Sequence, residues 1–232
     1  MQPPFVDIHT HAAKTAADLI QIVNLDLEQD CSGKGYCSYG IHPWTLDNTE
    51  AQIEEMLPLL EERLQLLNVL ALGEAGLDKM HKSSYEKQME LFERQIELSE
   101  KLQKPMILHD VKCHNEILAL RKKHKAKQPW VLHGFNGTGQ DIRQLTGYGL
   151  YLSVGEDLLH SERKIGKSLG NIPLDLLFLE TDMAKTDIGK VYDAAARLLE
   201  MDLLELRTRI FANFARVFSS SQSLHDEARP KH

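Results

Sequence analysis

The chain has 232 residues, of which 42% are hydrophobic and 26% are charged, a balance typical of a globular protein and not of a disordered or collagen-like one. Its net charge of −7 argues against a protein that coats nucleic acid through a broad basic face, but it is compatible with local binding of phosphate through metal ions. No apolar run is long enough to span a membrane, and the amino-terminal residues lack the pattern of a secretory signal.

The three cysteines, Cys31, Cys37 and Cys113, form no CxxC motif and cannot all pair with one another. We therefore expect small, buried hydrophobic side chains in a protein of the reducing cytoplasm. We also expect a monomer without a membrane partner.

Eight short apolar runs rich in β-branched residues predict eight strands. They cover residues 5–9, 19–23, 36–41, 69–73, 106–109, 130–133, 150–154 and 176–180.

Helical patterns lie between most of these runs. One covers residues 83–103 and opens with the capping box Ser83-x-x-Glu86; another covers residues 49–67, with a kink expected at Pro58. The motif Asp202-x-x-Glu205 begins a third that runs towards Phe218. Further helices are predicted near residues 114–125, 139–146, 157–169 and 189–200.

Strands that alternate with helices imply parallel pairing and right-handed crossovers, and hence an α/β fold. Eight strands at this length favour a TIM-type (β/α)8 barrel over an open doubly wound sheet. Because only about a dozen residues separate the first three strands, the first one or two crossover helices must be reduced. We expect one barrel domain over residues 1–218 and a frayed polar tail over residues 219–232.

Histidines and carboxylates recur at the carboxyl ends of the predicted strands, the face on which such barrels build active sites. In chain order these residues are Asp7, His9 and His11 at the first strand, His42 after the third, Glu74 at the fourth, His109 at the fifth, His133 at the sixth, and Glu180 and Asp182 at the eighth.

Imidazoles and carboxylates on one rim form a nitrogen and oxygen donor set suited to divalent cations. Any single histidine here could equally be a hydrogen-bonded strand-end residue, but their convergence favours a metal centre. About six ligands are too many for one tetrahedral zinc, so we predict two divalent ions, with Glu74 able to bridge them. The ligand types leave Mg²⁺, Zn²⁺ and Mn²⁺ open.

These segments resemble the TatD family of metal-dependent hydrolases, in the amidohydrolase-like barrel class. The matching motifs follow the family order along nearly the whole chain: Asp7-Ile-His-Thr-His11, Gly40-Ile-His-Pro43, Gly73-Glu-Ala-Gly-Leu-Asp78, Pro105-Met-Ile-Leu-His109, Leu132-His-Gly-Phe-Asn-Gly137, Leu179-Glu-Thr-Asp182 and Asn213-Phe-Ala-Arg-Val-Phe218.

The resemblance implies a metal-dependent deoxyribonuclease that hydrolyses phosphodiesters, often from single-stranded ends, with DNA or a short oligonucleotide as substrate. It also implies a ligand set. His9, His11 and Asp182 would hold one ion, His109 and His133 would hold the other, and Glu74 would bridge the two.

Other residues have roles that the sequence leaves open. Asp182 is the expected general base for the attacking water. His42 is expected either to contact phosphate or protonate the leaving oxygen, or to be a loop histidine beside Trp44. Glu180 could anchor a metal-bound histidine, whereas Asp7 could do the same or close a turn. Asp78 is expected to cap the loop after Glu74.

The sequence departs from the family pattern at two substrate-facing segments. The usual arginine after His109 is missing, which leaves Lys112 as a substitute, and residues 183–187 replace the usual Ser-Pro-Tyr. The basic run at residues 121–127 is expected to be a solvated helix end. Three aromatic residues could stack bases, although buried packing is the expectation for each; they are Trp44, Phe135 and Tyr148.

Three alternatives to a phosphodiesterase remain at this point. They are a metallohydrolase of small C–N or ester substrates, a phosphomonoesterase similar to histidinol phosphatase, and a non-enzyme that binds metal. The predicted water-activating carboxylate, Asp182, disfavours the last of these.

Overall fold

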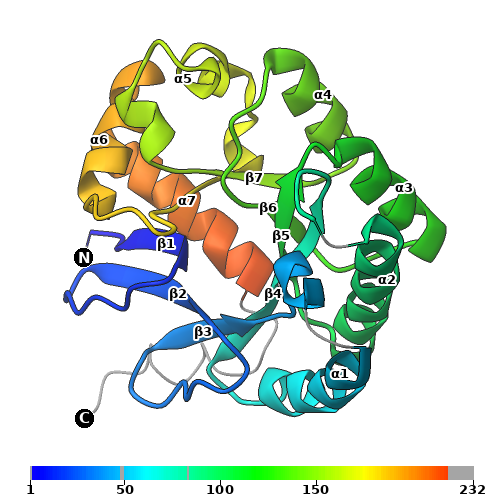
Figure 1. Ribbon diagram of the computed structural model, residues 1–232. Helices are drawn as coiled ribbons and strands as arrows, with labels where there is room; N and C mark the ends of the chain where they lie inside the picture. The colour runs from blue at the N-terminus through cyan, green and yellow to red at the C-terminus, as the bar shows by residue number, and fades with distance from the viewer. Residues whose placement is uncertain (1, 48–49, 83, 219–232) are drawn as a thin grey trace.

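Eight parallel strands form one sheet whose order follows the sequence, with helices around its outer side (Figure 1). The computed structural model describes residues 2–47, 50–82 and 84–218. The strands are β1 (Phe5–Thr10), β2 (Leu19–Leu25), β3 (Tyr36–Tyr39), β4 (Val69–Asp78), β5 (Met106–Val111), β6 (Trp130–Leu132), β7 (Tyr151–Val154) and β8 (Leu177–Leu179). All eight predicted strands are present, and the TIM-type barrel is confirmed.

Seven α-helices and four 3-10 turns complete the described elements. The helices are α1 (Glu50–Leu64), α2 (Tyr85–Leu102), α3 (His114–His124), α4 (Gly139–Gly147), α5 (Lys164–Ser168), α6 (Ile188–Leu198) and α7 (Leu203–Phe218). The 3-10 turns are η1 (Pro43–Asp47), η2 (Glu156–Leu159), η3 (Leu169–Asn171) and η4 (Leu174–Leu176). Helix α1 continues through Pro58.

Helix caps agree with the sequence in one case and differ in another. The Asp202 carboxylate accepts hydrogen bonds from the backbone of Leu204 and Glu205 at the start of α7, as its position predicts. At α2 the capping residue is Ser84, whose hydroxyl accepts the Lys87 N–H. The predicted cap Ser83, the helix start at Thr49 and the tail at 219–232 lie outside the described residues.

The single helix predicted over residues 157–169 is wrong. The segment forms η2 and the short helix α5 instead, because it folds back against the loop after β6. Asn136 accepts a hydrogen bond from the Ile165 backbone, and the Ser168 hydroxyl donates to the Gly137 carbonyl. These side-chain contacts compete with a continuous helix.

The first two crossovers are reduced, as predicted. Residues 11–18 and 26–35 connect β1 to β2 and β2 to β3 without a helix. The amino-terminal strand is instead covered by the last two helices. The Tyr192 hydroxyl of α6 exchanges two hydrogen bonds of 3.0 Å with the Val6 backbone, and the Arg207 guanidinium of α7 lies 3.8 Å from the centre of the Phe5 ring.

Barrel closure between β8 and β1 occurs at the rim. The Asp182 N–H donates to the His9 carbonyl at 2.9 Å, and the His11 N–H donates to the Asp182 carbonyl at 3.1 Å, which together make a parallel bridge between Thr10 and Asp182. Asp182 takes a left-handed backbone conformation there, with φ of 51°. The backbone contact that closes the barrel therefore also brings Asp182 to the two histidines of β1.

Most strand residues are buried, and most of those away from the rim are apolar. Every residue of β4 is buried, and so is almost all of β1. Burial of each large aliphatic side chain contributes about 2 kcal/mol, so the barrel has a rigid base for a polar rim. The three cysteines are free and buried, as expected. Among the described residues no helix is long and apolar enough to cross a membrane.

Candidate metal centre

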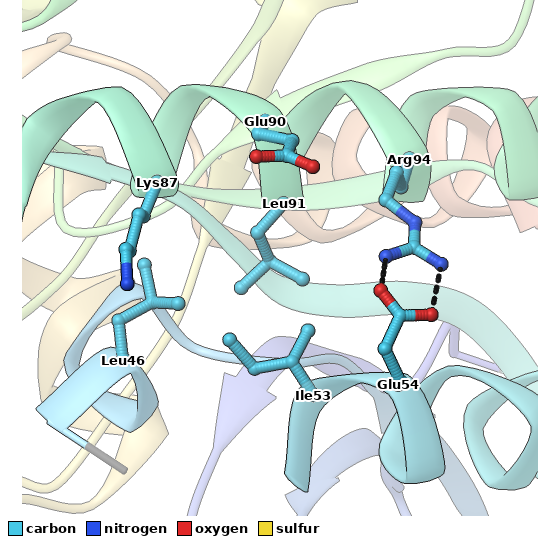
Figure 2. Close-up of a pocket in the computed structure, with 7 residues that line it drawn as sticks. All are labelled: Leu46, Ile53, Glu54, Lys87, Glu90, Leu91 and Arg94. Carbon is cyan, nitrogen blue, oxygen red and sulfur yellow. Dashed lines mark hydrogen bonds and ion pairs between the residues drawn. The ribbon is translucent and has the colours of Figure 1, made fainter. Parts of the chain in front are cut away.

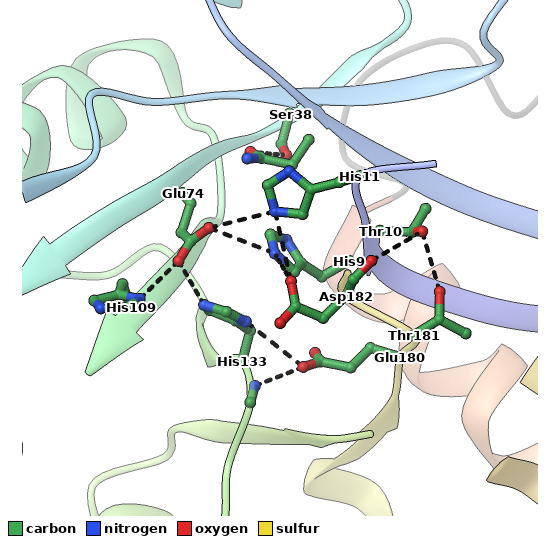
Figure 3. Close-up of polar contacts among 12 residues, drawn as sticks. His9, Thr10, His11, Ser38, Glu74, His109, His133, Glu180, Thr181 and Asp182 are labelled. Atoms are coloured by element: carbon green, nitrogen blue, oxygen red, sulfur yellow. Dashed lines mark hydrogen bonds and ion pairs between the residues drawn. The ribbon is translucent and has the colours of Figure 1, made fainter. Parts of the chain in front are cut away.

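Six predicted ligands converge at the carboxyl ends of the strands (Figure 3). His9 lies in β1 and His11 just after it, whereas His133 and Asp182 follow β6 and β8. Two ligands lie deeper in their strands than predicted: Glu74 and His109 are inside β4 and β5, because these strands continue to Asp78 and Val111. Pairing of Asp78 with Val111 extends both strands beyond the ligands.

His9, His11 and Asp182 form the first group of donors, called here the β1 set. Nε2 of His9 lies 3.4 Å from Oδ1 of Asp182 and 3.6 Å from Oε2 of Glu74. Nε2 of His11 lies 3.5 and 3.8 Å from the same two oxygens. With Glu74, the set therefore places four donor atoms face to face, and none of its imidazoles forms a hydrogen bond to either carboxylate.

This spacing and the lack of hydrogen bonds fit a shared cation. A tetrahedral ion with bonds of about 2.1 Å separates its ligands by roughly 3.4 Å. Both ring nitrogens of His9 are buried and have no hydrogen-bond partner among the described residues. Buried polar atoms without partners are costly, and a bound cation is one of the few things that satisfies an imidazole lone pair in such a place.

His109 and His133 form the second group, the β5–β6 set, and they differ by contacting Glu74 directly. Nδ1 of His109 and Nε2 of His133 each lie 2.7 Å from Oε1 of Glu74. Burial opposes the charge on the Glu74 carboxylate, but the charge of His133 and the hydrogen bonds from these histidines outweigh it and hold the Glu74 pKa well below its usual range. Glu74 thus offers one oxygen to each set, as a bridging ligand must.

His42 approaches the centre from the side of β5. Its Nε2 lies 3.2 Å from Oε1 of Glu74, and its Nδ1 accepts a hydrogen bond of 3.2 Å from the backbone N–H of Trp44. Because Nδ1 uses its lone pair in this way, the ring carries a hydrogen on Nε2. His42 therefore faces Glu74 as a hydrogen-bond donor, which fits the predicted contact with phosphate better than a ligand role.

Glu180 and Asp78 lie next to the predicted ligand histidines, on the side away from Glu74. The fully buried Glu180 lies 3.6 Å from Nδ1 of His133 and accepts the Gly134 N–H at 2.6 Å. Asp78 lies 3.5 Å from Nε2 of His109 and also accepts the Met80 N–H, which is the capping contact predicted for it. Carboxylates in these positions orient metal-binding imidazoles.

Asp7 has a structural role and not the alternative role of holding a histidine. Its two carboxylate oxygens accept hydrogen bonds from the Thr181 N–H at 3.0 Å and from the Thr181 hydroxyl at 2.6 Å. Burial raises the Asp7 pKa to about 7. These bonds tie β1 to the segment that carries Asp182.

The aromatic residues divide differently from the expectation that all three are buried. Phe135 is buried, but Trp44 and Tyr148 are more than half exposed. Trp44 borders the centre, with its ring centroid 4.8 Å from that of His42, whereas Tyr148 ends α4 at the opposite face of the barrel. Sequence alone gave no sign of this difference, because burial depends on which loops cover each ring.

Two cavities border the site, and a third lies elsewhere on the same side of the fold as η1. One of about 330 Å³ lies beside Asp182 and is lined also by Phe135, Glu156 and Asp157. Another of about 510 Å³ lies on the other side, next to His42 and Glu74. The third, between η1, α1 and α2, is lined by Leu46, Ile53, Leu91 and the Glu54–Arg94 ion pair, together with Lys87 and Glu90, and by none of the predicted ligands (Figure 2). It contains no histidine.

Comparison with known proteins places these features in one family. A family model described as TatD related DNase matches residues 6–219. The uncharacterized metal-dependent hydrolase YjjV of Escherichia coli is 30% identical over 150 residues, which are 63% of this chain and 57% of that protein. The 3'-5' ssDNA/RNA exonuclease TatD of Citrobacter koseri is 29% identical over 147 residues, 62% of this chain and 55% of that protein.

A third relative, deoxyribonuclease Tat-D of Schizosaccharomyces pombe, is 32% identical over 118 residues, 49% of this chain and 38% of that protein. The matched region thus spans little more than half of the first two relatives and less of the third.

Solved structures show the same fold. The crystal structure of E. coli YjjV superposes with a TM-score of 0.80 at 23% identity and covers 93% of this chain and 98% of that chain. A TatD family hydrolase from Entamoeba histolytica gives 0.78 at 18% identity, with 94% and 99% covered. Because the family model extends from the first strand to the end of α7, the chain belongs to the TatD-related DNase family.

Proposed function

We propose that the protein is a divalent-metal-dependent phosphodiesterase that cleaves DNA or short oligonucleotides at their ends. One observation carries the proposal. Donor groups from β1, β4, β5, β6 and the segment after β8 meet around Glu74, which touches both the β1 set and the β5–β6 set. A donor group bridged in this way suits a pair of cations better than one.

The β1 set with Glu74 would hold one ion, and the β5–β6 set with Glu74 would hold the other. When bound, two divalent ions activate water and neutralise charge on the phosphate oxygens. Four imidazoles and two carboxylates favour Zn²⁺ or Mn²⁺ over Mg²⁺, because imidazole is a poor ligand for magnesium.

The chain's own residues supply proton transfer and orientation. The Asp182 side chain is partly exposed at the mouth and accepts the proton of the attacking water at a carboxylate oxygen. His42 directs its Nε2 proton into the site, where it bonds a phosphate oxygen. Glu180 lies beside Nδ1 of His133, and Asp78 lies beside Nε2 of His109. In each ring this is the nitrogen that does not contact Glu74, so the two carboxylates fix the orientation of the rings.

Two features bear on a nucleic acid substrate. Relatives carry the names deoxyribonuclease and ssDNA/RNA exonuclease. In this chain the arginine usual in the family after His109 is missing, but Lys112 is exposed at the end of β5, where it is available to a phosphate near the centre.

The test compares Asp182→Asn with the parent protein on single-stranded DNA, a bis-p-nitrophenyl phosphodiester, a phosphomonoester and a lactone, after reconstitution with each metal. General bases contribute on the order of 10²- to 10⁴-fold, so DNA hydrolysis should fall in that range. The fold should persist, because asparagine tolerates the left-handed backbone at this position. Asp193→Asn, on the exposed face of α6, is the matched control and should retain full activity.

A parent protein that cleaves the lactone or the monoester but neither diester would replace this proposal with the small-substrate alternative. One observation favours that alternative: Asp26, Glu28 and Glu55 line the 510 Å³ cavity beside His42, which disfavours a polyanion on that side. Full activity of the Asp182→Asn variant would refute the assigned base.

A further inference from the structure

The proposed function leaves one exposed aromatic residue beside the metal centre unexplained. On the basis of that function, we propose that Trp44, supported by His81, is a stacking site for the nucleobase adjacent to the scissile phosphate. The site takes a planar base on the β4–β5 side of the centre and leaves the opposite side unused by the nucleic acid chain.

The position of Trp44 suits this role. It lies in η1, directly after β3, and its ring centroid is 4.8 Å from that of His42 and 5.9 Å from that of the ligand His109. A base stacked on the indole is therefore within one nucleotide of the phosphate site. Base stacking on exposed aromatic side chains is the common way in which proteins hold single strands without reading their sequence.

The orientation of Trp44 is fixed although the residue is 52% exposed. Its Nε1 donates a 2.8 Å hydrogen bond to Oδ2 of the buried Asp78, which also contacts His109. The His81 ring stacks on the indole, with centroids 5.5 Å apart and planes 18° from parallel. An exposed ring held from two sides loses little side-chain entropy when a ligand binds.

The charge around the centre also differs between its two sides. Lys79, Lys82 and Lys112 are exposed on the β4–β5 side, where the Lys79 N–H bonds the Val111 carbonyl at 3.1 Å. Lys79 also pairs with Glu116, so part of its charge is compensated. On the other side of His42, the cavity wall carries Asp26, Glu28 and Glu55. A polyanion is therefore favoured on the Trp44 side and repelled from the other.

Fluorescence gives a readout of binding that does not depend on hydrolysis. The chain has two tryptophans, and the other, Trp130, is fully buried. In the Trp130→Phe protein loaded with Zn²⁺, a single-stranded dT10 with phosphorothioate linkages should quench the Trp44 emission in a saturable manner. The same oligonucleotide with an abasic residue at each end should quench it at least several-fold less.

Kinetics on normal DNA then separates stacking from the support that Trp44 gives to Asp78. Trp44→Ala should raise KM for a base-bearing end by roughly 10- to 100-fold, with a smaller change in kcat and little change for an abasic end. Trp44→Phe loses the hydrogen bond to Asp78 but keeps a ring, so most of the affinity should return. Tyr148→Ala, an exposed aromatic residue at the far face, is the control and should match the parent protein.

Equal KM changes for base-bearing and abasic ends would overturn the stacking site while leaving the proposed nuclease intact. Equal quenching by both oligonucleotides, or no quenching, would overturn it as well. If DNA is not hydrolysed at all but the base-dependent quenching is present, the stacking site stands and the proposed phosphodiesterase fails.

Discussion

The two oxygens of Glu74 have different surroundings. Nε2 of His9 and of His11 lie 3.6 and 3.8 Å from Oε2. A ring nitrogen of His109 and one of His133 each lie 2.7 Å from Oε1. Burial and the nearby His9 lower the His11 pKa, so its ring is neutral and its lone pair is available. Burial also opposes the charge of His133, but Glu74 and Glu180 outweigh it and raise its pKa well above the usual value.

The difference indicates that the two halves of the proposed metal centre would be prepared in different ways. The β1 set is arranged like a coordination shell, whereas the β5–β6 set is held by charge-assisted hydrogen bonds that a cation must displace. Metal uptake at the second set should therefore release protons, and uptake at the first should release few.

The largest effect is expected at the residue that both sets share. Glu74→Gln removes the charge that bridges them, so bound metal should fall from two ions to less than one. DNA hydrolysis should fall by more than about 100-fold, which is the upper range for residues that only support a ligand. Elemental analysis and activity assays measure both quantities.

Glu54→Gln, in the exposed ion pair with Arg94, is the matched control. It should keep both ions and full activity. If Glu74→Gln retained two ions, neither set would depend on the bridge.

A smaller effect separates the two sets in the absence of metal. In chelated protein, His133→Ala should cost about 2 kcal/mol more free energy of unfolding than His9→Ala. Both variants leave a similar cavity, but only the first removes one of the two 2.7 Å partners of the buried Glu74 carboxylate. Urea unfolding with a chelator present measures the difference, and equal losses would contradict the contrast between the sets.

The smallest effect concerns a histidine–carboxylate pair outside both sets. His114 hydrogen-bonds Asp110 of β5, whose side chain is only 1% exposed, and this bond raises the His114 pKa above 6.5. The resulting stability is present below pH 6.5 and is lost as the pH rises through the higher folded-state value. Relative to His114→Gln the gain should be about 1 kcal/mol or less, because the ring is partly exposed.

Unfolding of the parent and His114→Gln proteins at pH 5.5 and 8.5 measures this gain, with and without chelator. A chelator-dependent difference would show that the pair is coupled to the metal centre after all.

Much of the site was predictable because strand order determines it. His9, His11, His133 and Asp182 come together simply because parallel strands of a barrel end on the same face. The depth of Glu74 was not predictable, because it depends on how far β4 and β5 continue to pair beyond the ligands.

Features that depend on side-chain torsions were also beyond the sequence. The donor role of His42 follows from its bond to the Trp44 backbone, and the exposure of Trp44 follows from its anchor on Asp78. Neither contact has a sequence pattern, whereas the broken helix at residues 157–169 reflects tertiary bonds that override local helical periodicity.

The absence of helices after β1 and β2 has a consequence for biosynthesis. Val6 obtains its cover from Tyr192, 186 residues further along the chain, and Asp18 meets Arg207 across 189 residues. A nascent chain on the ribosome therefore carries its first strands uncovered until translation has passed α7. Such long-range dependence slows folding and leaves the apolar surface of the emerging amino-terminal half exposed to aggregation in the meantime.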